Sequence, residues 1–187
     1  MHRAIEVAVI DGERGFGNGL LMPAGPLREP VRRLAAVDYI VVNGSRLDLA
    51  QPQYLMETVP VRFRKVLGEE SLAPEEFCQR HPWVRGICGI GNPGRFFRTL
   101  ASTGLSVERY VMPDHHPYSG EEMDFSAQLP VVCTEKDAIK LARLDIDLSQ
   151  VWYLQVAVNV EPEFLSSLKE KLAALTIVPA GQVSGES

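Results

Sequence analysis

The sequence predicts an α/β protein built from parallel βαβ units. Two observations carry the prediction. From Pro74 onward, short runs rich in Val, Ile and Leu alternate with helical segments, and a glycine turn joins one of these strands to the helix that follows it. Strands that alternate with helices form βαβ units, and the right-handed crossovers of such units make the strands parallel.

The N-terminal third contains fewer regular elements. We expect a buried strand over Ile5–Ile10, because this run is rich in Val and Ile and ends in a turn. A loop over residues 12–30 holds five glycines and three prolines, and structured loops of this length are usually functional. A short helix over 31–36 and a strand over Tyr39–Val42 follow it. Residues 58–66 alternate as a strand, which we interpret as a ribbon joining two lobes.

The remaining elements follow from the same patterns. Helices are expected over residues 75–80, 95–102, 121–127, 136–144 and 162–175, and strands over 84–88, 106–112, 130–133 and 151–156. A buried parallel strand needs a neighbour on each side, yet the first expected strand begins within five residues of Met1. We therefore expect the chain to be a portion of a longer protein.

The composition restricts the classes of partner. The chain has 187 residues, of which 45% are hydrophobic and 23% charged, so it can bury a core as a soluble globular protein. Its net charge of −5 gives no general attraction to nucleic acid, and no nucleic-acid partner is expected. No apolar run reaches the roughly 18 residues of a membrane span. The three cysteines form no Cys-x-x-Cys pair, and we interpret them as reduced thiols of a cytosolic protein.

A glycine-rich segment, Gly89–Gly94, follows an expected strand and opens an expected helix. Its spacing, Gly-x-Gly-x-x-Gly, suits backbone amides that approach a pyrophosphate, and Asp114 lies where a ribose-binding carboxylate would stand. Pro93 removes one amide from the turn, however, and suits the first position of an ordinary helix. The segment is therefore either a strand-to-helix turn without ligand or the dinucleotide site of an oxidoreductase.

The sharpest feature of the sequence is the cluster Asp114-His115-His116. It follows the expected strand 106–112, so it should lie at the carboxyl edge of the parallel sheet, where open α/β folds bind ligands. A carboxylate beside an imidazole can hold one tautomer, which leaves the other ring nitrogen free to accept a proton. A catalytic or substrate-contacting role, structural capping of the loop and a metal site all remain open. The other two histidines, His2 and His81, are isolated in the sequence, which weakens the metal reading.

Two further motifs contain charged residues. Thr134-Glu135-Lys136-Asp137 has the spacing of a helix capping box, and Lys136 is then available to a phosphate or a carboxylate. Arg28 in the glycine-rich loop can bind a phosphate through two parallel hydrogen bonds, or form a surface salt bridge beside Glu29. No Gly-x-x-x-x-Gly-Lys-Ser/Thr sequence occurs, so this chain does not cradle a triphosphate by the P-loop route.

Taken together, the ordered motifs resemble the tetraacyldisaccharide 4'-kinases, and the resemblance covers residues 5–158. The motifs are Asp11-Gly12-x-Arg14-Gly15-Phe16-Gly17-Asn18-Gly19, Pro23-Ala24-Gly25-Pro26-Leu27-Arg28-Glu29-Pro30, Asn43-Gly44, Gly89-Ile90-Gly91-Asn92-Pro93, Pro113-Asp114-His115-His116, Thr134-Glu135-Lys136-Asp137-Ala138 and Trp152-Tyr153-Leu154. The resemblance implies a role in lipid A biosynthesis, the ATP-dependent transfer of a γ-phosphate to the 4'-hydroxyl of a tetraacyldisaccharide 1-phosphate.

The resemblance also implies site residues and cofactors. His115 would be the catalytic residue that helps to activate the hydroxyl, with Asp114 orienting it, and Arg28, His116 and Asn18 would contact the substrate. ATP and Mg²⁺ would be bound mainly by an N-terminal portion that carries the P-loop and an acidic magnesium motif, neither of which is present here. No cofactor-binding or metal-binding residue is therefore assigned within this chain, and we expect it to be inactive alone.

The family architecture implies the domain boundaries. Residues 1–56 would be the C-terminal remnant of a P-loop kinase core lobe, and residues 57–159 a smaller, Rossmann-like α/β lobe. Residues 160–187 would form a helix that packs back on the core, followed by a disordered tail. The family location is peripheral, on the cytoplasmic side of the bacterial inner membrane, with membrane contact through the missing N-terminal segment. A dinucleotide-binding oxidoreductase domain and a non-catalytic binding module are the alternatives.

Overall fold

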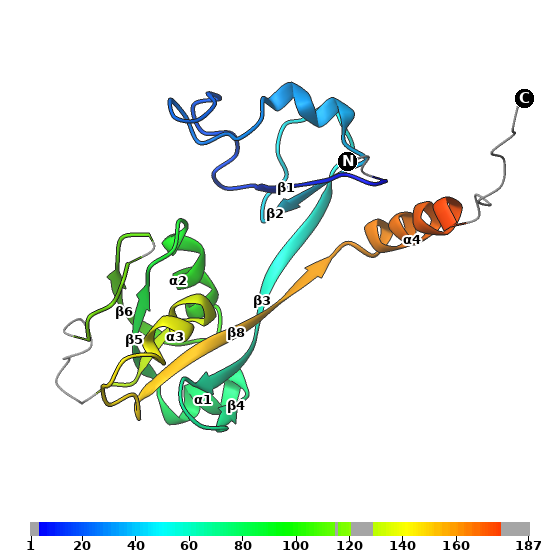
Figure 1. Ribbon diagram of the computed structural model, residues 1–187. Coiled ribbons are helices and arrows are strands. Elements are labelled where there is room, and N and C mark those ends of the chain that lie inside the picture. Colours follow the sequence, from blue (N-terminus) through cyan, green and yellow to red (C-terminus); the bar gives the residue numbers. More distant parts are fainter. Residues whose placement is uncertain (1–3, 115, 121–128, 177–187) are drawn as a thin grey trace, which may run out of the picture. The chain divides into compact units, whose positions relative to one another are not determined.

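The computed structural model describes residues 4–114, 116–120 and 129–176 (Figure 1). The chain divides into two compact units, one formed by Met1–Glu57 with Val158–Ser187 and the other by Thr58–Ala157. Two long strands, β3 (Tyr54–Lys65) and β8 (Val151–Val160), contribute residues to both units. The expected helix over 121–127, His115 and the expected disordered tail from 181 lie outside the described residues.

The first unit contains a parallel sheet and the last helix. Its elements are β1 (Val7–Asp11), the short 3-10 helix η1 (Val31–Ala36), β2 (Tyr39–Asn43), the first part of β3 and α4 (Pro162–Thr176). Strand β2 pairs in parallel with β1 on one side and with β3 on the other, and every residue of β2 is buried. Tyr39 and Val41 of β2 pack against Phe164 of α4.

The first strand differs from its prediction. The run Ile5–Ile10 was expected to be buried, but Val7 and Val9 of β1 are 40% and 62% exposed. The reason is that β1 is the edge strand of the described sheet, where it pairs only with β2, so one of its faces has no covering layer among the described residues.

The second unit has a mostly parallel sheet with the strand order β3-β8-β7-β5-β6. Its further elements are β4 (Ser71–Leu72), α1 (Pro74–Arg80), β5 (Trp83–Cys88), α2 (Pro93–Ala101), β6 (Ser106–Val111), β7 (Val131–Thr134) and α3 (Glu135–Leu141). Strand β5 pairs in parallel with β6 and β7, and β7 pairs in parallel with β8. The predicted α/β class with parallel strands is thus confirmed. The two-residue strand β4, antiparallel to β3, was missed because it is too short to show a pattern.

An aromatic cluster forms the core on the face of this sheet that α1 and α2 cover. The ring of Phe63, on β3, stacks on Phe77 of α1 with 4.0 Å between centroids, and Phe77 meets Trp152 of β8 edge to face at 5.1 Å. The alternation of β3 explains the first contact, because Phe63 faces the core while Arg62 and Arg64 are exposed. A second cluster, which includes Ile87, Cys133 and Leu141, packs on the face covered by α3.

Truncation of Phe77 tests the aromatic core. The variant Phe77→Ala should lower the free energy of unfolding by about 3 to 5 kcal/mol, because it removes a fully buried ring and leaves a cavity. Urea unfolding followed by tryptophan fluorescence measures this, since Trp152 is buried beside Phe77 whereas Trp83 is 63% exposed. The control Val111→Ala, at a position 58% exposed, should change stability by less than about 0.5 kcal/mol. Equal stability of the two variants would contradict the packing described.

Candidate functional site

The carboxyl ends of three neighbouring strands form the candidate site of the second unit. Strands β6, β5 and β7 lie side by side in parallel and end at Val111, Cys88 and Thr134. The segments that follow them therefore meet at one edge of the sheet. They are the glycine turn before α2, the loop after β6 and the first turn of α3, which include Gly89, Asp114 and Lys136. The placement of Asp114 at this edge is the one that the sequence predicted.

A buried carboxylate ties two of these segments together. Asp137 of α3 is fully buried, and its Oδ2 accepts the Gly89 N–H at 3.0 Å and the Thr134 hydroxyl at 2.7 Å. The Thr134 oxygen in turn accepts the Asp137 N–H at 3.2 Å, which confirms Thr134 as the N-cap of α3. The turn after β5 is thus hydrogen-bonded to the start of α3.

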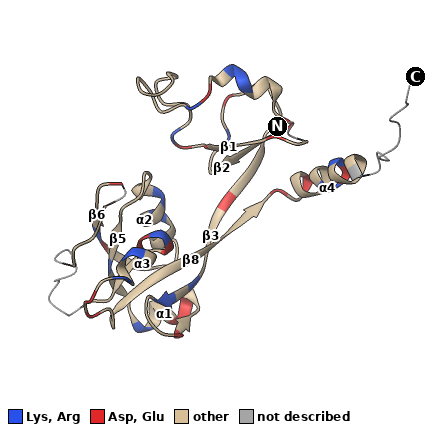
Figure 2. Ribbon diagram, viewed as in Figure 1, with Lys and Arg blue, Asp and Glu red and all other residues tan. Residues whose placement is uncertain are grey.

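Two lysines of α3 hold the loop after β6. Lys136 Nζ lies 3.3 Å from Asp114 Oδ1, and Lys140 Nζ donates to the His116 carbonyl at 3.0 Å. Of the two partners expected for Lys136, the structure shows the carboxylate. The lysines are one helical turn apart and so lie on one face of α3. In Figure 2, blue marks the Lys and Arg positions on this ribbon and red the Asp and Glu positions. The loop segment that carries the Asp-His-His cluster is therefore fastened to α3 on both sides of residue 115.

Tyr118 completes the inner wall of the site. Its ring is buried, meets the His116 ring edge to face at 5.0 Å between centroids, and has Lys140 Nζ 5.6 Å from its centroid. Burial, and after it the negative charge of Asp137, raises the pKa of the Tyr118 phenol, so the phenol is neutral at physiological pH. No sequence motif marks Tyr118 or Lys140, and our sequence reasoning missed both. Tyr118 is a large aromatic residue four positions after Asp114, and this spacing is the signal that could have suggested its place in the wall of the site.

The geometry of Gly89–Gly94 favours a strand-to-helix turn over a pyrophosphate site. The Gly89 N–H already donates to Asp137, and the Asn92 side chain caps α2 by accepting the Arg95 N–H at 3.2 Å. Pro93, the first residue of α2, has no N–H to offer. Within the motif, the Gly89 amide is therefore occupied and Pro93 offers none.

The other predicted substrate contacts, Asn18 and Arg28, belong to the first unit. Asn18 stabilises the glycine-rich loop, because its amide donates to the Ala24 carbonyl at 3.0 Å and its oxygen accepts the Leu20 N–H at 3.1 Å. Gly25 lies so close that a Cβ there would stand 2.3 Å from Asn18 Oδ1. Arg28 is exposed on this loop, and the salt bridge considered between it and Glu29 is not the one observed: Glu29 pairs with Arg33 at 3.6 Å.

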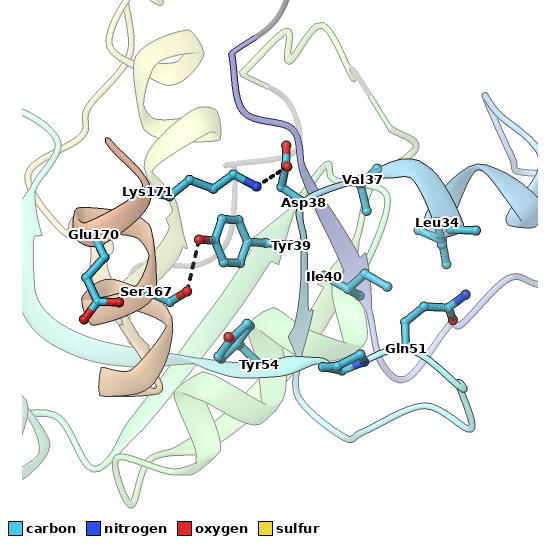
Figure 3. Close-up of a pocket in the computed structure, with 12 residues that line it drawn as sticks. Leu34, Val37, Asp38, Tyr39, Ile40, Gln51, Tyr54, Ser167, Glu170 and Lys171 are labelled. Carbon is cyan, nitrogen blue, oxygen red and sulfur yellow. Dashed lines mark hydrogen bonds and ion pairs between the residues drawn. The ribbon is translucent and has the colours of Figure 1, made fainter. Parts of the chain in front are cut away.

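A separate cavity of about 530 Å³ lies in the first unit, between β2 and α4 (Figure 3). Asp38 and Lys171 form an ion pair across it, and the Tyr39 hydroxyl lies 3.1 Å from Ser167 Oγ. These two contacts, drawn as dashed lines in Figure 3, join α4 to the start of β2. The cavity is at the amino end of β2, whereas ligands in parallel sheets bind at the carboxyl ends, so we do not assign it as the functional site.

Residues 4–114, 116–120 and 129–176 contain no group of three or more His, Cys, Asp or Glu side chains arranged to hold a metal ion. Among the same residues, no helix combines the length and the apolar character needed to span a bilayer.

Substitution of Asp137 tests the anchor of the site. The variant Asp137→Ala should lose about 3 to 5 kcal/mol of stability, because it leaves the buried Gly89 N–H and the Thr134 hydroxyl without their acceptor and removes a buried charge that faces Lys140. Asp137→Asn should lose less, since its amide oxygen can still accept from Gly89. Urea unfolding and hydrogen exchange at the Gly89 amide measure the effect. Unchanged protection of that amide in Asp137→Ala would contradict the anchor.

Comparison with known proteins gives one consistent family. The model of the tetraacyldisaccharide-1-P 4'-kinase family matches residues 1–173. Proteins named tetraacyldisaccharide 4'-kinase from Hahella chejuensis and Alkalilimnicola ehrlichii are 40% and 44% identical over 173 residues, which is 92% of this chain and 50% of each relative. The protein of that name from Methylobacillus flagellatus is 39% identical over 176 residues. The chain spans about half the length of the curated relatives it matches.

A solved structure shares the fold. It is an "apo" form of LpxK from Aquifex aeolicus in complex with ATP, with a TM-score of 0.64 and 24% sequence identity. The match covers 93% of this chain and 53% of that one. Because the family model covers most of the sequence and the relatives share about 40% identity with it, the chain belongs to the tetraacyldisaccharide-1-P 4'-kinase family.

Proposed function

We propose that this chain supplies the acceptor-activating part of a lipid A 4'-kinase. The reaction is the transfer of the γ-phosphate of ATP to the 4'-hydroxyl of a tetraacyldisaccharide 1-phosphate. The observation that carries the proposal is the contact of Lys136 with Asp114 at the carboxyl edge of the sheet, in a chain of this family. The contact holds the Asp114 carboxylate, which two histidines follow in the sequence, at the edge where ligands bind in such folds.

In the proposed mechanism, His115 accepts the proton of the attacking hydroxyl and Asp114 orients its ring. A general base must stand within hydrogen-bonding reach of the proton that it removes, so the position of the loop matters as much as its chemistry. The side chains of Lys136 and Asp114 are 45% and 48% exposed, and an exposed pair of this kind contributes little stability. Its contribution is instead to fix the direction of the Asp114 carboxylate. His116, Arg28 and Asn18 are the proposed substrate contacts.

The phosphate donor is part of the proposal. The LpxK structure from Aquifex aeolicus contains ATP, and we propose ATP as the donor here too. The described residues do not fit a magnesium site, since they contain no suitable group of three ligands, and we derive no step through Mg²⁺. We propose that the triphosphate and Mg²⁺ are held by the half of the family's length that this chain does not span.

We further propose how this chain divides between the two lobes of the kinase. Residues 1–56 would belong to the kinase core lobe, 57–159 would form the smaller lobe, and the segment from 160 would pack on the core. The proposed location is peripheral, on the cytoplasmic side of the bacterial inner membrane, with membrane contact made by the portion of the family that this chain does not cover. In phosphoryl transfer most of the acceleration comes from positioning and charge neutralisation around the phosphates. The chain alone should therefore show negligible kinase activity.

A chimera tests this function. Residues 1–173 replace the matching half of the Hahella chejuensis protein, and transfer of ³²P from ATP to the disaccharide 1-phosphate is measured. The chimera should be active, while the isolated chain should not. Asp114→Ala and His115→Ala should each lower kcat of the chimera by about 100-fold or more, since general base catalysis contributes roughly 10² to 10⁴. Arg28→Ala should mainly raise KM for the disaccharide.

The matched control is Arg143→Ala. Arg143 is an exposed residue two positions after the end of α3, so this substitution should leave kcat unchanged. A folded chimera without transferase activity would overturn the proposed function and favour a non-catalytic binding module. Full activity of the Asp114 and His115 variants would overturn the proposed roles.

A further inference from the structure

Tyr118 has an unusual backbone conformation two residues after His116. Its φ angle is +24°, and among the described residues it is the one residue other than glycine with a positive φ. A bulky side chain disfavours this region, so the conformation persists only where the surrounding structure holds it, and such residues cluster at functional sites. Tyr118 is also buried, with an exposed fraction of 3%. The fold therefore constrains this residue more closely than a surface loop requires.

The Tyr118 hydroxyl is buried close to Asp137. A Cβ placed on Gly89 would lie 3.4 Å from this hydroxyl and 3.4 Å from Asp137 Oδ1, so the two oxygens face the same point. Within the described part of the chain, neither oxygen has a hydrogen-bond partner, and Lys140 Nζ lies 3.8 Å from Oδ1. A phenol can donate a hydrogen bond and a carboxylate accepts one, so the two groups complement each other. Asp137 thus offers the partner that a buried hydroxyl requires.

The ring of Tyr118 contacts the imidazole of His116. The two rings meet edge to face, with an interplanar angle of 89° and 5.0 Å between centroids, which is an arrangement that aromatic pairs prefer. Lys140 lies near both residues, because its Nζ donates to the His116 carbonyl and is 5.6 Å from the centroid of the Tyr118 ring. Lys140 therefore holds the backbone of His116, while Tyr118 packs against its side chain.

We propose that Tyr118 is a positioning residue for the lipid acceptor, because its ring sets the direction of the His116 imidazole toward the disaccharide 1-phosphate. The inference rests on the proposed role of His116 as a substrate contact. An imidazole that is oriented before binding loses less rotational freedom when the substrate binds, so the contact costs less entropy. The Tyr118 hydroxyl faces Asp137 inside the protein, and Tyr118 acts only through His116.

Binding of the disaccharide 1-phosphate to the chimera, measured in detergent micelles without ATP, tests the inference. Tyr118→Leu removes the ring and should weaken binding about three- to tenfold, since pairs of aromatic rings contribute on that order. Tyr118→Phe keeps the ring but loses the donor that faces Asp137. It should bind within about twofold of the parent, although it should unfold at a lower urea concentration. The matched control is Tyr153→Leu, at a partly buried tyrosine of β8 that packs against the same core cluster, and it should bind as the parent does.

A double-mutant cycle separates positioning from general support of the fold. If Tyr118 acts through His116, the double variant of His116→Ala and Tyr118→Leu should bind the disaccharide as His116→Ala alone does. The KM for ATP should be unchanged in Tyr118→Leu, because the inference gives this residue no part in nucleotide binding. Thermal melts monitored by circular dichroism establish that each variant folds. If Tyr118→Leu does not fold, Tyr118→Met replaces it, since its longer, flexible side chain fills more of the same space without a ring.

A folded Tyr118→Leu chimera that binds the disaccharide as the parent does would overturn the inference. An equal loss in Tyr153→Leu, or a loss in the double variant beyond that of His116→Ala, would also overturn it, in favour of a purely structural role. These outcomes are separable from that of the proposed function. A chimera that binds the disaccharide, and binds it more weakly with Tyr118→Leu, but transfers no phosphate would overturn the kinase function alone. An active chimera in which Tyr118→Leu changes neither binding nor turnover would overturn the positioning role alone.

Discussion

The buried carboxylate of Asp137 is the interaction on which the rest of the site depends. It joins the turn after β5 to the start of α3, because it accepts hydrogen bonds from the Gly89 N–H and from the Thr134 hydroxyl. Residue 89 is a glycine, so no side chain separates the two segments there. Gly89 suits this close approach, since a Cβ would lie 3.2 Å from the Pro113 carbonyl oxygen, a tight contact, and 3.4 Å from Asp137 Oδ1 and the Tyr118 hydroxyl. The close approach of three segments is thus maintained by one fully buried acceptor. A buried carboxylate is costly unless it has partners: Asp137 Oδ2 accepts two hydrogen bonds, and Lys140 Nζ lies 3.8 Å from Oδ1.

The fixed position of α3 has two consequences. Its lysines hold the loop after β6, because Lys136 contacts the Asp114 carboxylate and Lys140 donates to the His116 carbonyl at the sheet edge. The same first turn of α3 also lines, through Lys136, a cavity of about 310 Å³ whose other walls include Ile90 and Phe96. The loop that carries Asp114 and one wall of this cavity therefore share one support. The proposed role of the chain in activating the acceptor hydroxyl relies on this support, because activation requires a fixed orientation.

Local sequence patterns predicted much of this arrangement. The strands β5 and β7 and the helices α2 and α3 were expected within two or three residues of their observed ends, because apolar runs and capping residues mark them. Asp114 was placed at the sheet edge because a loop that follows a parallel strand must lie there. The features that local patterns did not reveal depend on contacts between residues far apart in the sequence. They are the ion pair of Lys136 with Asp114, the burial of Tyr118 and the hydrogen bond from the Gly89 N–H to Asp137. The exposure of Val7 and Val9 was mispredicted for the same reason, since apolar composition does not specify which strand lies at an edge.

The central claim is that α3 acts on the reaction through Asp114. A double-mutant cycle in the chimera tests it most directly, with kcat measured for Asp114→Asn, Lys136→Met and the double variant. If Lys136 serves only to position Asp114, its removal should cost activity in the parent and nothing further once Asp114 is replaced. The double variant should then match Asp114→Asn alone. If the loss of kcat in the double variant instead equals the product of the two single-variant losses, Lys136 acts independently of Asp114, which would contradict the account.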